Sequence, residues 1–234
     1  ELANYIKENR NQEKIGNLNW KEIINKDTDA KLPSSSFLAI ILKFISCILF
    51  NTFFRVKVKG KEKIEIDKPT IYVANHQSFL DGFLFNYAVP SKLVKKTYFL
   101  ATVAHFKSSI MKSFANSANV VLVDINKDIA EVMQILAKVL KENKNVAIYP
   151  EGLRTRDGKM NKFKKSFAIL AKELNVDVQP YVISGAYELF PTGKKFPRPG
   201  KISVEFLDKI KVEDLSYDEI VDKSYKAIEE KLTK

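Results

Sequence analysis

The chain has 234 residues, 45% of them hydrophobic and 29% charged, which is enough to build one substantial core. Its single cysteine, Cys47, excludes an intrachain disulfide framework, and one cysteine with two histidines does not supply the four ligands of a structural zinc site. The net charge of +11 predicts attraction to anionic partners such as a membrane surface, a phosphorylated lipid, coenzyme A or an acidic carrier protein. Nucleic acid is not an expected partner, because the chain has no zinc finger, basic zipper or interleaved basic and aromatic motif.

Residues 1–35 form a polar N-terminal segment and linker. Within them we expect a short helix over Trp20–Asn25, and the serines and Pro33 that follow are typical of a linker. The first residue is Glu1 rather than methionine, so we expect a loose tail or the remnant of a preceding domain in a longer polypeptide. This segment is therefore predicted to be separate from the body of the protein.

Residues 36–54 are the most hydrophobic segment and are predicted to form a membrane-associating helix. Residues 37–54 would reach ~27 Å as a helix, just short of a hydrocarbon core, and a lysine at its centre costs roughly 2.5–3.5 kcal/mol on insertion. The polar residues fall near one helical face: Lys43, Ser46, Cys47 and Asn51. This pattern favours a helix that lies in the membrane interface, with Phe44 and Leu49 toward lipid, over one that spans the membrane. A core helix of the domain is the alternative.

From residue 55 to residue 234 short apolar runs alternate with amphipathic segments. The predicted strands are Phe54–Lys59, Thr70–Ala74, Tyr98–Thr102, Val120–Asp124, Val146–Tyr149, Val178–Ser184 and Ile202–Leu207. The predicted helices are Ile129–Glu142, Phe163–Leu174 and a last one that ends near Leu232, which Ser216 and Glu219 begin as a capping box. This alternation predicts an α/β domain with a single mainly parallel, mixed sheet of about seven strands flanked by helices.

The most informative stretch follows the predicted strand Thr70–Ala74. His76, one of the two histidines, lies in a polar turn, and Asp81 stands five residues further on. Across a turn into a helix, a carboxylate at this spacing can fold beneath the imidazole, fix its tautomer and make it a general base. A structural histidine is the alternative. The second histidine, His105, has no acidic residue near it in sequence and is expected to be structural.

A second polar turn follows the apolar run Val146–Tyr149. Its polar residues include Glu151, Gly152, Arg154, Arg156 and Lys159. Arginine's planar fork suits phosphate, and ligands collect at the carboxyl ends of strands in open α/β sheets. The two turns therefore predict one site in which a phosphorylated substrate meets a base. An ion pair of one arginine with Glu151 or Asp157 is the alternative.

These motifs resemble those of the glycerolipid acyltransferases, in particular the 1-acylglycerol-3-phosphate acyltransferase type. Their first motif, Asn-His-(four residues)-Asp, is matched in full by Asn75, His76 and Asp81. Their third motif, Glu-Gly-Thr-Arg-Ser-Arg, is matched at residues 151–156 except for a leucine at position 153 and a threonine at position 155. Residues 163–166 and 178–183 are similar to further blocks of the family, and the resemblance covers roughly residues 55–207. In the second block Ile125 stands where the family commonly has arginine.

The resemblance implies an enzyme that moves a fatty acyl group from an acyl thioester to the free hydroxyl of a lysophospholipid, with 1-acylglycerol-3-phosphate as the first expectation. It implies His76 as general base, oriented by Asp81, and an acceptor site in the second turn, with Arg154 on the phosphate and Glu151 on an arginine or the glycerol. The other acceptor residues are Gly152, Arg156 and Lys159. Phe79 and Leu80 are expected to face the acyl chain, with core packing as the alternative. No metal or cofactor is implied, since the donor, acyl-CoA or an acyl carrier protein thioester, is a co-substrate.

Three other functions stay open on the sequence. The first is an acyltransferase whose acceptor is another lysophospholipid, such as lysophosphatidylethanolamine. The second is a thioester hydrolase, and the third is a non-catalytic module that binds anionic membranes. In each case the hydrophobic helix predicts a peripheral or monotopic protein at the cytoplasmic face of a membrane.

Overall fold

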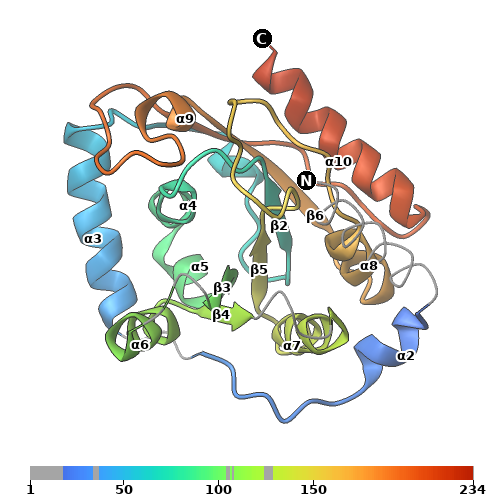
Figure 1. The fold of residues 1–234 in the computed structure, drawn as a ribbon. Helices are drawn as coiled ribbons and strands as arrows, with labels where there is room; N and C mark the ends of the chain where they lie inside the picture. The colour runs from blue at the N-terminus through green and yellow to red at the C-terminus, as the bar shows by residue number, and fades with distance from the viewer. Residues whose placement is uncertain (1–17, 34–36, 104–105, 107, 124–128, 234) are drawn as a thin grey trace, which may run out of the picture.

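The computed structural model describes residues 18–33, 37–103, 106, 108–123 and 129–233 (Figure 1). One seven-stranded sheet runs through the molecule in the order β1-β7-β6-β2-β5-β3-β4, with helices on both of its faces. This arrangement confirms the predicted α/β fold class. His105 and Ile125, on which two sequence expectations rest, lie outside the described residues.

The strands are short, and the two central ones are buried along their whole length. Their bounds are β1 Lys57–Lys59, β2 Ile71–Ala74, β3 Thr97–Thr102, β4 Val120–Val123, β5 Asn145–Ile148, β6 Val178–Ser184 and β7 Ser203–Phe206. All neighbouring strands are parallel except β6 and β7, so β1 and β7 run opposite to the other five. Continuous apolar runs are what parallel strands covered on both faces require, which is why the sequence located them well.

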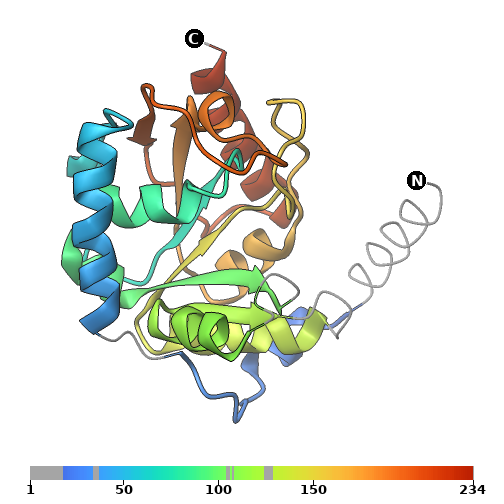
Figure 2. The same cartoon turned by 60° about the vertical axis from the view of Figure 1, so that its left-hand side comes forward.

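The helices form one layer on each face of the sheet (Figures 1 and 2). The layer that includes the hydrophobic segment contains α3 Phe37–Thr52, α4 Asp81–Ala88 and α5 Ser91–Lys96, with α6 Ser109–Ser117 beside α3. The other layer contains α7 Ile129–Lys141, α8 Ser166–Glu173 and α10 Tyr217–Leu232. Two further short helices are the 3₁₀ helix η1, Lys61–Lys63, and α9, Ala186–Leu189. Each face of the sheet therefore has its own buried apolar cluster.

The helix α2, Trp20–Asn25, packs against α7 and is part of the domain. Trp20 is 6% exposed and Ile24 is fully buried, and both belong to the apolar cluster on that face of the sheet. Lys141 of α7 donates a hydrogen bond of 2.9 Å to the Ile24 carbonyl, and Lys138 donates to two carbonyls further along. The described part of the N-terminal segment thus differs from the predicted separate piece, because two apolar side chains one helical turn apart dock it.

The helix α3 turns its polar side toward the protein. Lys43 donates hydrogen bonds to the carbonyls of Asn86 and Val89 at the end of α4, while Ser46 and Phe50 are buried. Burial lowers the pKa of Lys43. The opposite side, called here the outer face of α3, exposes five apolar residues: Ile41, Phe44, Ile45, Ile48 and Leu49. None of the helices in the described part of the chain combines the length and hydrophobicity that crossing a bilayer requires.

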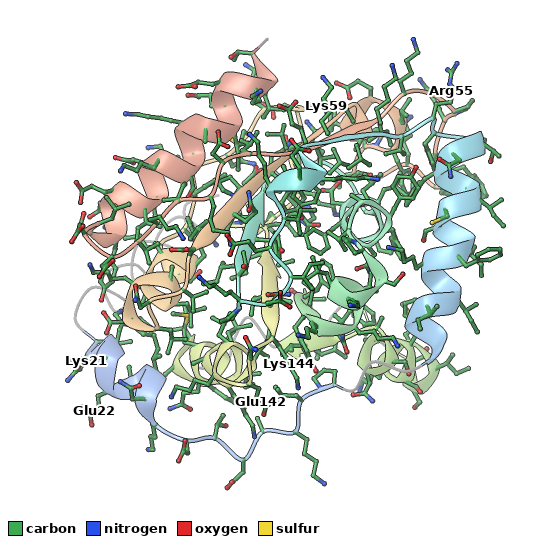
Figure 3. The ribbon with its side chains drawn as sticks, turned by 180° about the vertical axis from the view of Figure 1, so that it is seen from behind. Lys21, Glu22, Arg55, Lys59, Glu142 and Lys144 are labelled. Carbon is green, nitrogen blue, oxygen red and sulfur yellow. The ribbon has the colours of Figure 1, made fainter. Side chains whose placement is uncertain are left out.

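The position of α3 is easiest to see from behind the molecule (Figure 3). There α3 and α10 lie on opposite flanks, and Arg55 stands at the end of α3. Arg55, three residues after the last residue of α3, has a φ of 43°, a left-handed conformation in the short connection between α3 and β1. The Val56 N–H donates to the Phe50 carbonyl at 3.0 Å, so the connection to β1 folds back on the C-terminal end of α3.

The register of the sheet brings the two polar turns together. Val73 of β2 pairs with Ile148 of β5 in parallel, so both strands end at the same edge and their turns emerge side by side. On the other side of β2, Ala74 pairs with Tyr181 of β6, so the first turn also borders β6. Ligands collect at such an edge because helix N-termini and loop side chains converge there.

Candidate active site

Hydrogen bonds between buried groups fix the positions of the two turns. Asn75 anchors the first turn to β6, because its Nδ2 donates to the Ile183 carbonyl at 2.8 Å and its Oδ1 accepts from the Ile183 N–H at 2.9 Å. The second turn is joined to the first by Thr155, whose N–H donates to the His76 carbonyl at 2.9 Å. The chain around His76 is thus held from both sides.

His76 and Asp81 are in direct contact, as their spacing predicted. Nδ1 of His76 lies 2.8 Å from Oδ2 of Asp81, and the same oxygen accepts from the N–H groups of Gln77 at 2.7 Å and Ser78 at 2.9 Å. Asp81 begins α4, so its carboxylate folds back over the turn. The His76 side chain is 22% exposed and that of Asp81 is fully buried. Since Nδ1 is engaged, Nε2 is the ring nitrogen left to accept a proton.

The two carboxylate oxygens of Asp81 differ in their hydrogen bonding. Burial raises the pKa of Asp81, and the hydrogen bonds from His76 and the two backbone amides oppose that rise. All of these bonds go to Oδ2, while Oδ1 is buried without a hydrogen-bond partner in the part of the chain that the structure describes. The ionised form of such a buried carboxylate is stabilised most strongly when the neighbouring imidazole becomes positively charged.

Glu151 bonds to the protein itself. Its Oε1 accepts from the His76 N–H at 2.7 Å, and its Oε2 accepts from the N–H and Nδ2 of Asn161 at 2.8 and 2.9 Å. The residue is 6% exposed, and burial raises the pKa of Glu151 against these hydrogen bonds. The carboxylate thus ties the His76 turn to the far end of the second turn. Both carboxylate oxygens thus bond to protein donors, whereas the sequence led us to expect a contact with an arginine or the glycerol.

The ring of Tyr149 stacks on the ring of His76. Their centroids are 4.3 Å apart and their planes differ by 14°. The Tyr149 hydroxyl accepts a hydrogen bond of 3.2 Å from the Tyr181 hydroxyl, and burial raises the pKa of Tyr149 well above its ordinary value. An aromatic face restricts the imidazole to one plane and attracts a cation placed over it. This contact was not predicted from the sequence, although Tyr149 stands at the end of the strand that carries the second turn.

Arg154 lies beside the first turn with Phe79. Its guanidinium carbon is 6.0 Å from the centroid of the Phe79 ring, which belongs to a side chain that is 59% exposed. Arg154 is half-buried and forms no ion pair with a described acidic residue, so the alternative of a pair with Glu151 or Asp157 is not what the structure has. A guanidinium at this position can therefore bind an anion that comes from outside the protein.

The remaining predicted polar residues surround this edge. Arg156 and Lys159 have exposed side chains, and hydrogen bonds hold their backbones: the Arg156 carbonyl accepts from the Tyr187 hydroxyl at 2.8 Å and the Lys159 N–H donates to Asp157 at 3.0 Å. Gly152 has a φ of 77°, and a Cβ at this position would lie 3.0 Å from Nζ of Lys164. This turn therefore requires glycine at position 152.

The predicted apolar residues divide into two groups. Leu80 is 8% exposed and packs in the core, which is the alternative that the sequence left open beside an acyl-facing position. Phe79, Phe44 and Leu49 are exposed, by 59%, 68% and 43%. In the described residues, no group of three or more His, Cys, Asp or Glu side chains is arranged to hold a metal ion.

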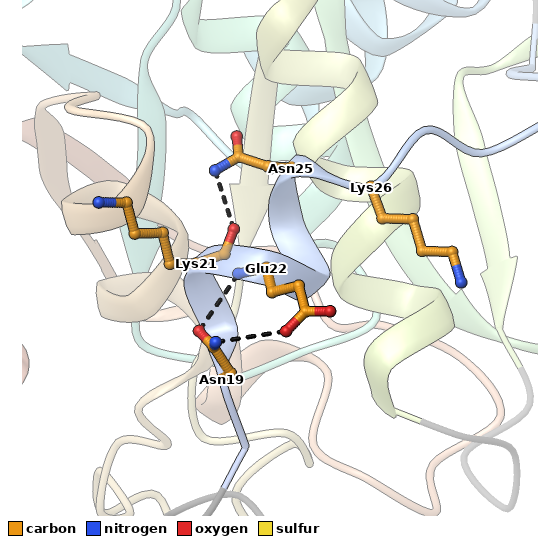
Figure 4. Close-up of a pocket in the computed structure, with 5 residues that line it drawn as sticks. All are labelled: Asn19, Lys21, Glu22, Asn25 and Lys26. Carbon is orange, nitrogen blue, oxygen red and sulfur yellow. Dashed lines mark hydrogen bonds between the residues drawn. The ribbon is translucent and has the colours of Figure 1, made fainter.

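Two hollows elsewhere on the surface are separate from this edge. One of about 620 Å³ lies on α2, where Asn19 caps the helix by accepting from the Glu22 N–H at 3.3 Å (Figure 4). The other, of about 300 Å³, lies between α2 and α7. Neither is lined by a residue of the two turns, and the first is formed by exposed side chains of one six-residue helix. The candidate site is therefore the edge where His76, Asp81, Tyr149 and Arg154 meet.

Comparison with known proteins places this arrangement in a family. Residues 55–184 match the family model described as Acyltransferase. The chain is 33% identical over 163 residues to a 1-acyl-sn-glycerol-3-phosphate acyltransferase of Chlamydomonas reinhardtii, covering 68% of this chain and 48% of the relative. It is 27% identical over 188 residues to the human 1-acyl-sn-glycerol-3-phosphate acyltransferase beta, covering 76% and 64%. The chain thus spans about half to two thirds of the length of these curated relatives.

The fold has a counterpart among solved structures. The crystal structure of the 1-acyl-sn-glycerophosphate (LPA) acyltransferase PlsC from Thermotoga maritima superposes with a TM-score of 0.71 at 25% identity, covering 84% of this chain and 79% of that one. The family model spans more than half of the chain, including both polar turns. The family expected from the Asn75-His76-Asp81 motif and residues 151–156 is thereby confirmed: the chain belongs to the acyltransferase family.

Proposed function

We propose that this protein transfers a fatty acyl group from an acyl thioester to the free hydroxyl of 1-acylglycerol-3-phosphate at a membrane surface. The observation that carries the proposal is the 2.8 Å contact between His76 and Asp81 at the strand edge where Arg154 also lies. A general base and an anion-binding group at one edge fit a phosphorylated alcohol as acceptor. The names of the relatives, 1-acyl-sn-glycerol-3-phosphate acyltransferases, support the same substrate.

In the proposed reaction His76 moves one proton twice. The acceptor oxygen attacks the thioester carbonyl carbon while Nε2 of His76 takes the hydroxyl proton, and the resulting imidazolium faces the buried Asp81 carboxylate. The carbon–sulfur bond then breaks, and the imidazolium returns the proton to the departing thiolate. General base catalysis of this kind contributes roughly 10²–10⁴-fold. The thioester is already activated, so this route requires no covalent enzyme intermediate.

Four contacts support the role of His76 because they hold its ring and backbone in place. Asp81 fixes the tautomer, Tyr149 restricts the plane of the ring, and Glu151 and Thr155 bond to the backbone N–H and carbonyl of His76. In this proposal Glu151 is a positioning residue, since both of its oxygens bond to protein donors. A base held this firmly loses little rotational freedom when the acceptor binds.

Arg154 is the proposed binding residue for the acceptor phosphate. It is half-buried, and its neighbour Phe79 offers an exposed aromatic surface to the acyl chains. Arg156 and Lys159, which are exposed, add positive potential around the same turn. The outer face of α3 is proposed to lie in the membrane interface, where both lipid substrates reside.

The decisive experiment measures acyl transfer by the purified chain. Labelled acyl-CoA and labelled acyl carrier protein are each offered with a panel of lysolipids that carry phosphate, phosphoethanolamine or phosphocholine headgroups. We expect transfer to 1-acylglycerol-3-phosphate and a loss of roughly 10²–10⁴-fold in kcat for His76→Ala, whose fold is checked by circular dichroism. Equal turnover by the variant would refute the base assignment, and labelled free fatty acid as the only product would identify a thioester hydrolase.

The panel also tests the acceptor site. Arg154→Ala removes a charge-assisted contact of about 1.5–3 kcal/mol, so kcat/KM for the phosphate acceptor should fall roughly 10–100-fold. Lys223→Gln, which removes one exposed charge on α10, serves as the control. If phosphoethanolamine and phosphate acceptors are used equally well, and Arg154→Ala affects both alike, the phosphate assignment fails.

A further inference from the structure

The loop from Pro191 to Lys201, called here the basic loop, connects α9 to β7. At its tip Phe196 is 82% exposed, and the cationic side chains around it are exposed as well: Lys194, Lys195, Arg198 and Lys201. We propose that the basic loop is a second membrane contact beside α3, in which Lys194 and Lys195 bind phosphates of anionic lipids and Phe196 inserts among the headgroups. This inference rests on the proposed function only in so far as that function places the protein at a membrane.

The backbone of the basic loop is built to present its tip. Gly193 has a φ of 92° with open space around it, and the Lys194 N–H donates to the Pro191 carbonyl at 3.3 Å, which makes a tight turn. At the base, the Arg198 N–H donates to the Leu189 carbonyl at 2.8 Å. A Cβ on Gly200 would lie 2.4 Å from the Leu189 side chain, so the loop backbone packs closely against Leu189 at this point. The base is fixed and the tip projects into solvent.

The base of the loop adjoins both α3 and the active site. The Gly200 N–H donates to the Phe53 carbonyl at 3.3 Å, directly after the end of α3, and Phe53 is itself 37% exposed. On the other side the Thr192 hydroxyl donates to the Thr155 carbonyl at 3.4 Å, in the turn that carries Arg154. In Figures 1 and 2 the orange loop after α9 lies next to the C-terminal end of α3. The basic loop therefore continues the outer face of α3 toward the site.

The composition of the loop fits a lipid surface. Several lysines elsewhere are paired with acids, for example Lys63 with Asp208 at 2.8 Å, whereas among the described residues no carboxylate pairs with the cations of the basic loop. A soluble anion would use these charges but would leave the Phe196 ring in water. Anionic lipid offers phosphates to the lysines and an interfacial region in which aromatic rings are favoured, so it satisfies both features.

The test measures binding of the full chain to vesicles by flotation, without any turnover. Vesicles of phosphatidylcholine alone are compared with vesicles of equal parts phosphatidylcholine and phosphatidylglycerol. The double variant Lys194→Gln, Lys195→Gln is matched by Lys223→Gln, Lys226→Gln, which removes the same charge from exposed positions of α10 on the opposite flank. A basic side chain near an anionic surface contributes about five-fold, so the loop variant should bind anionic vesicles roughly twenty-fold more weakly while the control binds like the parent chain.

Phe196→Ser separates insertion from charge. We expect this variant to bind both kinds of vesicle more weakly, because the ring acts through apolar contact. The proposal is overturned if the loop and α10 variants weaken binding equally, if neither does, or if the loop variant binds vesicles normally and instead raises KM for acyl-CoA. Binding is read without substrates, so an inactive chain that still shows the loop effect would refute the proposed function and leave this inference standing.

Discussion

The two turns at the carboxyl edge of the sheet differ sharply from the surface formed by the outer face of α3 and the basic loop. In the turns, carboxylates are buried and bonded: Asp81 is fully buried and Glu151 is 6% exposed. On the surface, Phe44 is 68% exposed and Phe196 is 82% exposed, so in the described part of the chain these two rings remain in contact with water, which is unfavourable for apolar groups. In the first region the carboxylates are bonded within the protein, whereas the second region exposes apolar rings for contact with something outside the protein.

The largest expected effect separates activity from stability at Asp81. In Asp81→Asn the amide oxygen can take the place of Oδ2 and keep the three hydrogen bonds, while the amide nitrogen replaces the unpartnered Oδ1. The fold should therefore persist, but an imidazolium at His76 loses its charged partner. We expect acyl transfer to fall roughly 10²–10⁴-fold. The new amide NH₂ is buried without an acceptor, which costs about 2 kcal/mol, but the substitution also removes a buried charge, so thermal unfolding should stay close to the parent temperature.

The pH dependence of stability sharpens this prediction. Because burial raises the pKa of Asp81, the folded state holds its proton more firmly than the unfolded chain. This difference in proton affinity stabilises the folded state. Its contribution is fully present below the pKa of the aspartate in the unfolded chain, about 3.9, and is lost as pH rises through the higher pKa of Asp81 in the folded protein. The stability of Asp81→Asn relative to the parent, measured by urea unfolding, should thus increase with pH above about 4. A relative stability that falls over this range would contradict the burial argument.

The second effect concerns the outer face of α3. Phe44→Ser combined with Ile48→Ser replaces side chains that are 68% and 55% exposed, so the fold should be unaffected. Burying such a pair in lipid is worth about 3 kcal/mol, and vesicle binding should weaken roughly 100-fold. Leu18→Ser, at an exposed apolar residue before α2, is the control. If the double variant unfolds while binding to vesicles is unchanged, α3 is a core helix whose outer face has no lipid partner.

Lys43 illustrates what the sequence could say about α3. Helical spacing correctly grouped Lys43 and Ser46 on one side. The spacing could not predict that this side faces inward, because the partners of Lys43 are carbonyls at the end of α4, 43 and 46 residues further along the chain. A cation at a helix C-terminus is favourable, but only the tertiary fold brings the two helices together. The same limit made α2 look detached, since its partners on α7 are more than 100 residues away.

An intermediate effect tests whether Glu151 holds the turns or binds substrate. In Glu151→Gln, one N–H donor from His76 or Asn161 must face the amide NH₂ instead of an oxygen. An unsatisfied buried donor costs about 2 kcal/mol, so thermal unfolding should occur about 4–8 °C lower. Glu213→Gln, at an exposed position, should unfold like the parent. An unchanged unfolding temperature together with a raised acceptor KM would return Glu151 to the acceptor site.

Glu151 and Asn161 also show where motif reasoning ends. The contact between His76 and Asp81 follows from a five-residue spacing across one turn, so sequence alone predicted it. The role of Glu151 depends on Asn161, ten residues away at the other end of a loop whose path no periodicity describes. Tyr149 was missed for a related reason: a strand-end tyrosine is as typical of core packing as of a contact with a catalytic ring. The sheet register, which sets β5 beside β2, is what brings the two rings together.

The smallest effect tests that ring contact with a matched pair of variants. Tyr149→Phe keeps the stacked ring and removes only the hydroxyl that accepts from Tyr181, so acyl transfer should stay close to the parent rate. Tyr149→Leu removes the aromatic face, and since a stacked pair contributes about 0.5–1.5 kcal/mol, kcat should fall up to about ten-fold with little change in KM. If phenylalanine and leucine lower kcat equally, the hydroxyl pair is what positions His76. If neither does, Asp81 and the backbone bonds are sufficient to hold the base.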